Sequence, residues 1–312
     1  MMKAVLPASA RPLLEPRLPP QVEVAWFASR DDALAMVADA DIAWVDLNRP
    51  RDTAAVIAAG TRLRWVSTIY AGIDAFDLQA LRERGTILTN GAGINAVAVA
   101  EYAVLGMLAA AKRFDMVVRM ADRHEWSGEA PGRVELAGSR ALVVGMGTIG
   151  TLIADRLRAF EVEVTGVTRS GRDGTLTPDA WRERIGEYDW IILAAPSTGS
   201  TRAMIDAQAL AAMKPSAWLI NVARGDMVDQ DALLVALGER QIAGAFLDTV
   251  SPEPLPADHP LWSAANAIHS MHLSGRSQTT MYQRAAALFL KNLDAFLTDR
   301  PMHNVVDLTA GY

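Results

Sequence analysis

The residues whose spacing points most directly to chemistry lie in a glycine-rich stretch at positions 141–150. The stretch reads Ala-Leu-Val-Val-Gly-Met-Gly-Thr-Ile-Gly, which predicts a buried parallel strand followed by the start of a helix. In such a turn Gly145 allows the tight bend, Gly147 lets the backbone approach a pyrophosphate, and Gly150 lets the helix pack on the sheet. Free N–H groups at the helix N-terminus then bind the phosphates. We therefore expect a dinucleotide site here, with a purely structural glycine turn as the alternative.

Three polar residues further along the chain could act together on a small substrate that carries a carboxylate and a carbonyl group. Arg224 follows an expected strand, and its guanidinium can bind a carboxylate and polarise a carbonyl together. His272 can donate the proton that the carbonyl oxygen needs, while Glu253 can orient His272 and favour its imidazolium form. Taken singly, each also has a structural reading: a surface arginine, a charge in a proline-rich loop and a buried histidine.

Five short motifs resemble those of the D-isomer-specific 2-hydroxyacid dehydrogenases. They are Tyr-Ala-Gly-Ile-Asp at 70–74, Val-Ala-Glu at 99–101, Asn-Val-Ala-Arg-Gly at 221–225, Leu-Asp-Thr-Val-Ser-Pro-Glu-Pro-Leu at 247–255 and His-Leu-Ser-Gly at 272–275. The motifs stand in the family's order over residues 65–285, and this joint occurrence favours catalysis over the separate structural readings. The chain length and the Pro-Leu-Trp step at 260–262 resemble the glyoxylate/hydroxypyruvate reductase branch.

The resemblance implies a role for each motif. Arg224, Glu253 and His272 are the expected catalytic residues, and the N–H groups of Gly72 and Ile73 are expected to bind the substrate carboxylate. The expected substrate-binding set is Tyr70, Ala71, Gly72, Ile73 and Arg224. Asp248 is expected to accept a hydrogen bond from the nicotinamide amide. The full expected cofactor-binding set is Val99, Gly145, Gly147, Thr148, Ile149, Gly150, Thr168, Arg169, Ser170, Ala195, Pro196, Thr201, Val222, Ala223, Asp248, His272 and Ser274. No metal site is expected.

Two departures from the usual pattern affect the cofactor and the catalytic histidine. NAD-binding folds usually place Asp or Glu after the second strand to bind the ribose hydroxyls. Here residues 167–172 read Val-Thr-Arg-Ser-Gly-Arg, and the first acid is Asp173. Because Arg169, Ser170 and Arg172 could bind a 2′-phosphate, we expect NADP(H) over NAD(H); a solvated basic turn in an NAD enzyme is the alternative. Met271 stands where the family commonly has proline, which leaves the placement of His272 less defined.

Composition restricts the class of protein. The 312 residues are many for one core and suit two α/β domains; hydrophobic residues make up 51% and charged residues 21%, typical of a globular protein. The net charge of −6 predicts no nucleic-acid partner, so an anionic ligand must be bound by local arginines. The chain contains no cysteine, which excludes disulfides, thiolate nucleophiles and thiolate metal sites.

Apolar patterning predicts alternating strands and helices. Strands are expected at 3–7, 22–27, 42–45, 65–69, 86–89, 163–168, 190–195, 218–222, 244–248 and 267–271, besides the strand before Gly145. Helices are expected at 30–40, 53–59, 75–84, 96–122, 148–160, 206–213, 229–240 and 277–298. Residues 4–6 form too short an apolar run for a signal peptide, and 96–111 is too short and polar to cross a membrane. We expect a cytoplasmic protein without a membrane partner.

The expected fold class is α/β, with two Rossmann-like or flavodoxin-like parallel-sheet domains and a cleft between them. Residues 1–94 with 276–312 should form the substrate-binding domain, and 95–275 the dinucleotide-binding domain. The expected function is that of an NADP(H)-preferring oxidoreductase acting on a small anionic 2-keto or D-2-hydroxy acid such as glyoxylate or hydroxypyruvate. The long apolar helix and the resemblance suggest a homodimer.

Three alternatives remain at this point. The chain could be a regulator that binds the dinucleotide and a partner protein without turnover, or an NAD-dependent 2-hydroxyacid dehydrogenase of different substrate range. Formate or phosphite oxidation is a third; formate enzymes have glutamine in place of Glu253 beside the histidine, which disfavours that reading. His269 is interpreted as structural because odd spacing on a strand would turn it away from His272. Trp126 is expected to pack within the chain.

Overall fold

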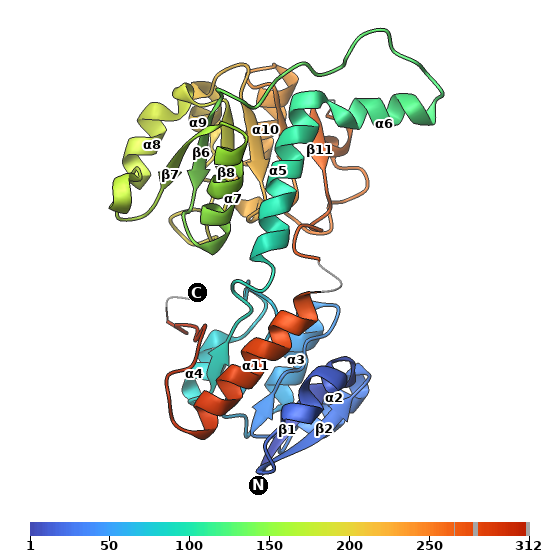
Figure 1. Cartoon of the computed structure of the whole chain (residues 1–312), viewed down its shortest axis with the longest axis vertical. Helices are drawn as coiled ribbons and strands as arrows, with labels where there is room; N and C mark the ends of the chain where they lie inside the picture. The colour runs from blue at the N-terminus through green and yellow to red at the C-terminus, as the bar shows by residue number, and fades with distance from the viewer. Residues whose placement is uncertain (265, 277–279, 310–312) are drawn as a thin grey trace. The chain divides into compact units, whose positions relative to one another are not determined.

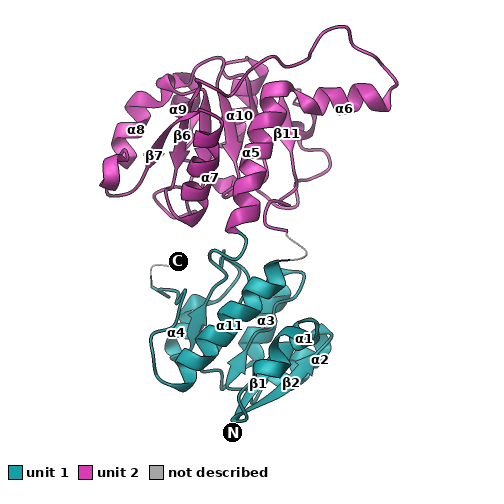
Figure 2. Ribbon diagram, viewed as in Figure 1, with its two compact units in different colours: residues 1–95, 277–312 teal, residues 96–276 magenta. Residues whose placement is uncertain are grey.

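Two parallel β-sheets, each made by its own part of the chain, organise the structure. The computed structural model describes residues 1–264, 266–276 and 280–309 (Figure 1). It divides into two units: unit 1 comprises Met1–Asn95 and Ser277–Tyr312, and unit 2 comprises Ala96–Arg276 (Figure 2). The expected α/β class with two parallel sheets is confirmed.

The sheet of unit 1 has the order β2-β1-β3-β4-β5, and every pairing in it is parallel. Its strands are β1 (Met2–Pro7), β2 (Val22–Phe27), β3 (Ile42–Ala43), β4 (Trp65–Ser67) and β5 (Ile87–Thr89). Along β1, Val5 belongs to one buried cluster while Ala4 and Leu6 belong to the other, because successive side chains of a strand point to opposite faces. Both faces of this sheet are therefore covered, as parallel sheets require.

Helices supply the two coverings of unit 1. Buried residues of α2 (Arg30–Val37), α3 (Pro50–Ala59) and α4 (Leu78–Glu83) form the cluster on one face. The other face is covered by α1 (Arg11–Leu14) and α11 (Met281–Leu297). There Phe289 of α11 stacks on the Trp65 ring at 4.9 Å between centroids. The expected first residues of this helix, 277–279, lie outside the described residues.

The sheet of unit 2 has the order β11-β10-β9-β8-β6-β7, again with every pairing parallel. Its strands are β6 (Arg140–Val144), β7 (Glu163–Val167), β8 (Trp190–Leu193), β9 (Trp218–Asn221), β10 (Gly244–Leu247) and β11 (Ala267–His269). The chain runs outward from β6 to β7 and then returns to place β8 on the other side of β6. Ligands of open α/β sheets bind beyond the carboxyl ends of the strands at such a reversal.

Two helical layers cover the sheet of unit 2. The cluster on one face includes buried residues of α5 (Ala96–Lys112) and α7 (Thr148–Ala159). The opposite cluster includes residues of α8 (Pro178–Arg184), α9 (Ala207–Ala212) and α10 (Gln230–Gly238). Side chains accept hydrogen bonds from the first turns of these three helices: Thr177 caps α8, Asp206 caps α9 and Asp229 caps α10.

The prediction of one helix over 96–122 is wrong. The segment forms α5 and a separate α6 (Phe114–Asp122), with Arg113 between them in the left-handed region at φ 46°. The returning chain explains the break, because Val134 N–H donates to the Ala111 carbonyl and the Lys112 ammonium donates to the Val134 carbonyl. Figure 1 shows α6 leading away from the sheet into a long loop.

Other differences lie at element ends. The strands expected at 42–45, 65–69 and 267–271 stop after Ala43, Ser67 and His269, because the residues that follow turn into loops at the sheet edge. The helix α8 was not expected from the sequence. Among the described residues, no helix combines the length and apolarity needed to cross a membrane.

Candidate active site

The glycine turn lies at the carboxyl end of β6, where the sheet order reverses. Gly145 has φ 99°, and a Cβ there would lie 2.6 Å from the Ala195 backbone nitrogen, so only glycine fits. A Cβ on Gly150 would lie 1.9 Å from the Gly145 carbonyl oxygen, so the helix packs directly on the turn. A Cβ on Gly147 would enter open space. The turn therefore has room for a ligand at the position where a pyrophosphate is expected, beside the N-terminus of α7.

The ribose end of the expected cofactor site lies after β7. Thr168 is half-buried, and its hydroxyl is hydrogen-bonded to that of Thr175 at 2.7 Å. Arg169 and Ser170 are exposed at this strand end, and Gly171 follows in the left-handed conformation at φ 65°. The first acid, Asp173, is exposed and lies 3.9 Å from the Arg172 guanidinium.

His272 and Glu253 form a close pair. The Nδ1 atom of His272 lies 2.6 Å from Oε2 of Glu253, and the other carboxylate oxygen accepts a hydrogen bond from the Val250 N–H at 3.2 Å. Burial raises the pKa of Glu253, but the hydrogen bond with His272 and the charges of His272 and Arg224 outweigh it, so this pKa lies below its usual value. The carboxylate is therefore charged at neutral pH, and the ring leaves Nε2 to face a reactant.

Arg224 is held beside this pair by its own loop. Asn221 at the end of β9 accepts from the Ala223 N–H and donates to the Arg224 carbonyl, at 3.0 and 2.9 Å. A Cβ on Gly225 would lie 1.9 Å from the Val250 carbonyl carbon, so the loops after β9 and β10 touch backbone to backbone. The structure thus brings together the three residues that the sequence proposed as catalytic, and it does so within unit 2.

Asp248 organises the loop that presents His272. Its carboxylate Oδ1 accepts from the Ser270 hydroxyl at 2.7 Å and from the Leu273 N–H at 2.9 Å, and its carbonyl accepts from the His272 N–H at 2.6 Å. These bonds hold Met271 and His272 at φ 57° and 54°, a conformation that costs non-glycine residues free energy. The expected contact of Asp248 with nicotinamide stays a prediction.

The remaining expected cofactor residues lie on the same sheet edge or beside it. Residues 195, 196 and 201 follow β8, and 222 and 223 follow β9; Thr148 and Ile149 begin α7. Val99 lies buried in α5, and Ser274 is buried after His272. The hydroxyl of Thr249, next to Asp248, is buried without a hydrogen-bond partner among the described residues. An orphaned polar atom and an open glycine turn both fit a bound dinucleotide.

The expected substrate-binding segment 70–73 belongs to unit 1 and follows β4. Tyr70 donates its hydroxyl to the Leu47 carbonyl, and Asn90 donates to the Ala71 carbonyl at 3.1 Å. Within the part of the chain that the structure describes, the N–H groups of Gly72 and Ile73 have no protein acceptor. Ile73 is 5% exposed, so its N–H is a donor in a largely buried setting.

Sequence reasoning missed two residues that shape the site. Gln230 at the start of α10 accepts from the Ser251 N–H at 2.9 Å and donates to the Ser251 carbonyl, which fixes the loop carrying Glu253. Ser270 supplies the hydroxyl bond to Asp248 described above. Both are ordinary polar residues at the end of a strand or helix. Their sequence context does not mark them as part of the site, and only their contacts in the folded structure do.

His269 is structural, though not for the reason expected. Its Nε2 lies 2.9 Å from the Leu261 carbonyl, its ring lies 5.1 Å from that of Trp262, and burial lowers its pKa. The strand ends at His269, so His272 follows in a left-handed turn and the two residues do not share a strand.

Comparison with known proteins supplies the family. Residues 104–274 match the family model described as D-isomer specific 2-hydroxyacid dehydrogenase, NAD binding domain. A glyoxylate reductase of Thermofilum pendens is 33% identical over 282 residues, which cover 87% of this chain and 83% of the relative. The chain belongs to the D-isomer specific 2-hydroxyacid dehydrogenase family. Members of this family are NAD(P)-dependent oxidoreductases.

Solved structures agree with the family's fold. A D-isomer specific 2-hydroxyacid dehydrogenase family protein from Aeromonas salmonicida superposes with a TM-score of 0.88 at 28% identity, covering 98% of this chain and 99% of that one. An NADPH-dependent glyoxylate/hydroxypyruvate reductase from Sinorhizobium meliloti, solved with NADP and malonate, gives 0.79 at 26% identity, covering 99% and 98%. The chain spans only 56% of the length of a D-3-phosphoglycerate dehydrogenase relative.

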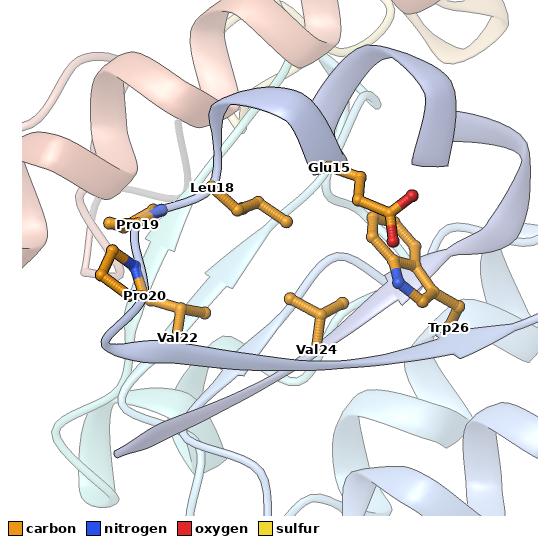
Figure 3. Close-up of a pocket in the computed structure, with 7 residues that line it drawn as sticks. All are labelled: Glu15, Leu18, Pro19, Pro20, Val22, Val24 and Trp26. Atoms are coloured by element: carbon orange, nitrogen blue, oxygen red, sulfur yellow. The ribbon is translucent and has the colours of Figure 1, made fainter.

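The family match includes the glycine turn, Arg224, Glu253 and His272, all in unit 2. It does not include segment 70–73. A hollow in unit 1, lined by Leu18, Pro19, Pro20 and neighbouring residues of β2, lies outside every motif of the family (Figure 3). Its one acid, Glu15, is paired with Arg11 at 2.7 Å. With apolar walls and a carboxylate, this hollow is unsuited to an anionic acid.

Proposed function

We propose that this chain is an NADP(H)-preferring reductase of small 2-keto acids, with glyoxylate and hydroxypyruvate as the first candidates. The observation that carries the proposal is the 2.6 Å pair of His272 and Glu253 beside Arg224, on the same sheet edge as the glycine turn. The names of the relatives, glyoxylate reductase and glyoxylate/hydroxypyruvate reductase, support the substrate class.

The residues divide the reaction among themselves. The nicotinamide cofactor supplies hydride to the carbonyl carbon when bound. Arg224 binds the substrate carboxylate and polarises the carbonyl, and its planar guanidinium can do both. His272 gives its Nε2 proton to the carbonyl oxygen, which completes the 2-hydroxy acid. Glu253 holds the ring through Nδ1 and stabilises its charged form; its second oxygen is fixed by Val250.

The N–H groups of Gly72 and Ile73 are the second element proposed for the substrate carboxylate. They are donors without protein acceptors among the described residues, and their motif resembles one of the family's. Backbone N–H groups bind an anion without the side-chain entropy cost that a lysine would add.

The preference for NADP(H) rests on the residues after β7. Arg169 and Ser170 are exposed directly after β7, the strand end where we expect the cofactor ribose, and the nearest acid in the segment is three residues beyond Ser170. A guanidinium and a hydroxyl stabilise a phosphate, whereas an acid at the strand end would repel it.

A substrate panel tests the function directly. Purified protein is assayed with glyoxylate, hydroxypyruvate, pyruvate and bulkier 2-keto acids, each with NADPH and NADH. We expect turnover with small keto acids and NADPH, and a 10²–10⁴-fold lower kcat in His272→Ala. His303→Ala, at an exposed histidine outside the site, is the control and should keep wild-type activity. Binding of NADPH without turnover of any keto acid would favour a regulatory protein.

We also propose a homodimer formed through α5, α6 and the loop that follows. This surface exposes several large apolar side chains: Leu105, Phe114, Met116, Val117, Val118, Trp126 and Val134. The expected packing of Trp126 within the chain is wrong, since this side chain is 96% exposed. An apolar groove between α5 and α7, lined by Leu105, Leu108 and Phe160 among others, continues the surface. Many exposed large apolar side chains on successive elements are typical of a subunit interface.

Light scattering after size exclusion tests the dimer. Val118→Asp places a charge on α6 and should give a monomer, while Val235→Asp, at an exposed position of α10, should not change the mass. A monomeric wild type at micromolar concentration would refute the proposal. A cytoplasmic location stays a prediction.

A further inference from the structure

Asp46 is a carboxylate of unit 1 whose three hydrogen bonds all come from neutral donors. It follows the short strand β3, where it is half-buried. Its Oδ1 accepts from the Thr68 hydroxyl at 2.5 Å, while its Oδ2 accepts from the Ile69 N–H at 2.6 Å and from the Trp44 indole N–H at 2.8 Å. Two of the three donors belong to the segment that leaves β4 toward Gly72 and Ile73.

The bonds of Asp46 extend along this segment. The Thr68 hydroxyl that donates to Asp46 also accepts from the Tyr70 N–H at 3.1 Å. From the other side, the Gly91 N–H donates to the Tyr70 carbonyl at 2.8 Å, and Asn90 donates to the Ala71 carbonyl. Residues 68–71 are thus held between the loops that follow β3 and β5, and Asp46 supplies the contacts from the β3 side.

Keeping a carboxylate here has a cost. Burial raises the pKa of Asp46 to about 6, even though its three hydrogen bonds act in the opposite direction. Within the described part of the chain no cation contributes to this shift, and the donors Thr68, Ile69 and Trp44 are uncharged. An amide here would carry no charge; its single oxygen could accept the bonds from Ile69 and Trp44, and its NH2 group would donate to the Thr68 hydroxyl. An ionisable group whose pKa is shifted by burial and whose hydrogen bonds fix a loop is a candidate for a functional role.

We propose that Asp46 is a positioning residue for substrate: it fixes segment 68–71 so that the N–H groups of Gly72 and Ile73 stay directed at a substrate carboxylate. The inference rests on the proposed function, because it takes these N–H groups as the carboxylate-binding element. Asp46 itself does not touch substrate in this proposal. Its effect passes through Thr68 and Ile69.

Two matched pairs of variants test this role. Thr68→Val keeps the shape but removes the hydroxyl that links Asp46 to Tyr70, and Thr68→Ser retains that hydroxyl. Asp46→Ala removes both carboxylate oxygens and with them the three hydrogen bonds, and Asp46→Asn can keep two donors on its oxygen and donate its amide to Thr68. For Thr68→Val and Asp46→Ala we expect KM for the keto acid to rise about tenfold or more, while kcat stays within about threefold of the wild-type value. KM for NADPH should not change, and the Ser and Asn variants should behave like wild type.

Hydrogen exchange gives a readout independent of turnover. Peptides covering residues 68–76 should exchange faster in Thr68→Val and Asp46→Ala than in their controls, while peptides of β1 exchange at the wild-type rate. Unchanged keto-acid KM in both variants, or unchanged exchange of this segment, would overturn the inference. If one variant fails to fold, the other pair decides. A wild type that reduces no 2-keto acid would instead refute the proposed function, and the exchange rates would still report whether Asp46 holds the segment.

Discussion

The stability of unit 1 in Asp46→Asn, relative to wild type, should increase as pH rises through the raised pKa of Asp46. In an unfolded chain the Asp46 carboxyl has its ordinary pKa of 3.8, and burial in the folded chain raises this pKa to about 6. Between these values the folded state binds more protons than the unfolded state, so stability falls as pH rises. The stability that protonated Asp46 contributes to unit 1 is fully present below the pKa of the unfolded chain, and it is lost as pH rises through the folded-state pKa of about 6. An amide at position 46 does not titrate and avoids this loss.

The size of the effect follows from the two pKa values. Each unit of difference corresponds to about 1.4 kcal/mol, so ionisation of Asp46 destabilises unit 1 by about 3 kcal/mol at pH 8 and by about 1 kcal/mol at pH 4.5. The stability of Asp46→Asn relative to wild type should therefore increase by about 2 kcal/mol between these pH values. Any fixed difference in hydrogen bonding between acid and amide cancels in this comparison.

The assay must report on unit 1 alone, since a chain with two units need not unfold in one step. Urea titrations read by pulse-labelling hydrogen exchange give separate midpoints for peptides of β1 and β4. As pH is raised from 4.5 to 8, the urea midpoint of unit 1 in Asp46→Asn should move upward relative to that of wild type. For peptides of unit 2, the midpoints of variant and wild type should remain equal. A difference that is constant with pH, or that reverses sign, would refute the assignment of a raised pKa to Asp46.

Three further predictions concern unit 2. Arg169→Ala should lower kcat/KM for NADPH by about 10- to 100-fold, with little effect for NADH; equal losses would remove Arg169 from the 2′-phosphate site. Arg224→Lys keeps the charge but loses the planar guanidinium, so keto-acid kcat/KM should fall sharply while NADPH binding, measured by fluorescence, is retained. Arg158→Lys on α7 is the control. Because the pKa of Glu253 lies below its usual value, Glu253 is charged throughout the assay range, and Glu253→Gln should shift the pH profile of reduction to lower pH; superimposable profiles would exclude electrostatic coupling to His272.

Much of unit 2 could be predicted because its signals are local. The apolar run before Gly145 could be recognised as a buried strand, and the positive φ of Gly145 and the tight packing of Gly150 are what the spacing required. Strand ends were placed too late by one or two residues. The apolar character continues past the last ladder hydrogen bond, so hydrophobicity does not mark where the strand stops.

The break between α5 and α6 at Arg113 could not be predicted from the neighbouring residues in the sequence. Residues 96–122 have continuous helical character, but near the end of α5 the Ala111 carbonyl and the Lys112 ammonium are hydrogen-bonded to Val134, in a segment that returns later in the chain. Such a contact is decided by tertiary structure, which overrides local helix propensity. The exposure of Trp126 has the same origin, since the sequence does not show which face of a loop has a partner.

In the candidate site, too, some features could be predicted from the sequence and others depend on the folded structure. Arg224, Glu253 and His272 could be chosen from residue type and motif order, but their geometry depends on Asp248 and Ser270, whose importance is spatial. Met271 illustrates the point. A proline there would fix φ near −65°, whereas Met271 has φ 57°, so the loop of this chain cannot be inferred by substituting the family's usual residue.

The cost of this conformation is offset by the buried carboxylate of Asp248. Its oxygen bonds to the Ser270 hydroxyl before the turn and to the Leu273 N–H after it, so the two left-handed residues between them have both ends fixed. His272 is then constrained at its backbone by Asp248 and at its ring by Glu253. Two carboxylates of the loops around β10 thus perform different tasks, one buried and structural and the other half-exposed and electrostatic. The direction of His272 Nε2 follows from both together, because a ring held at only one end could rotate away from a substrate carbonyl.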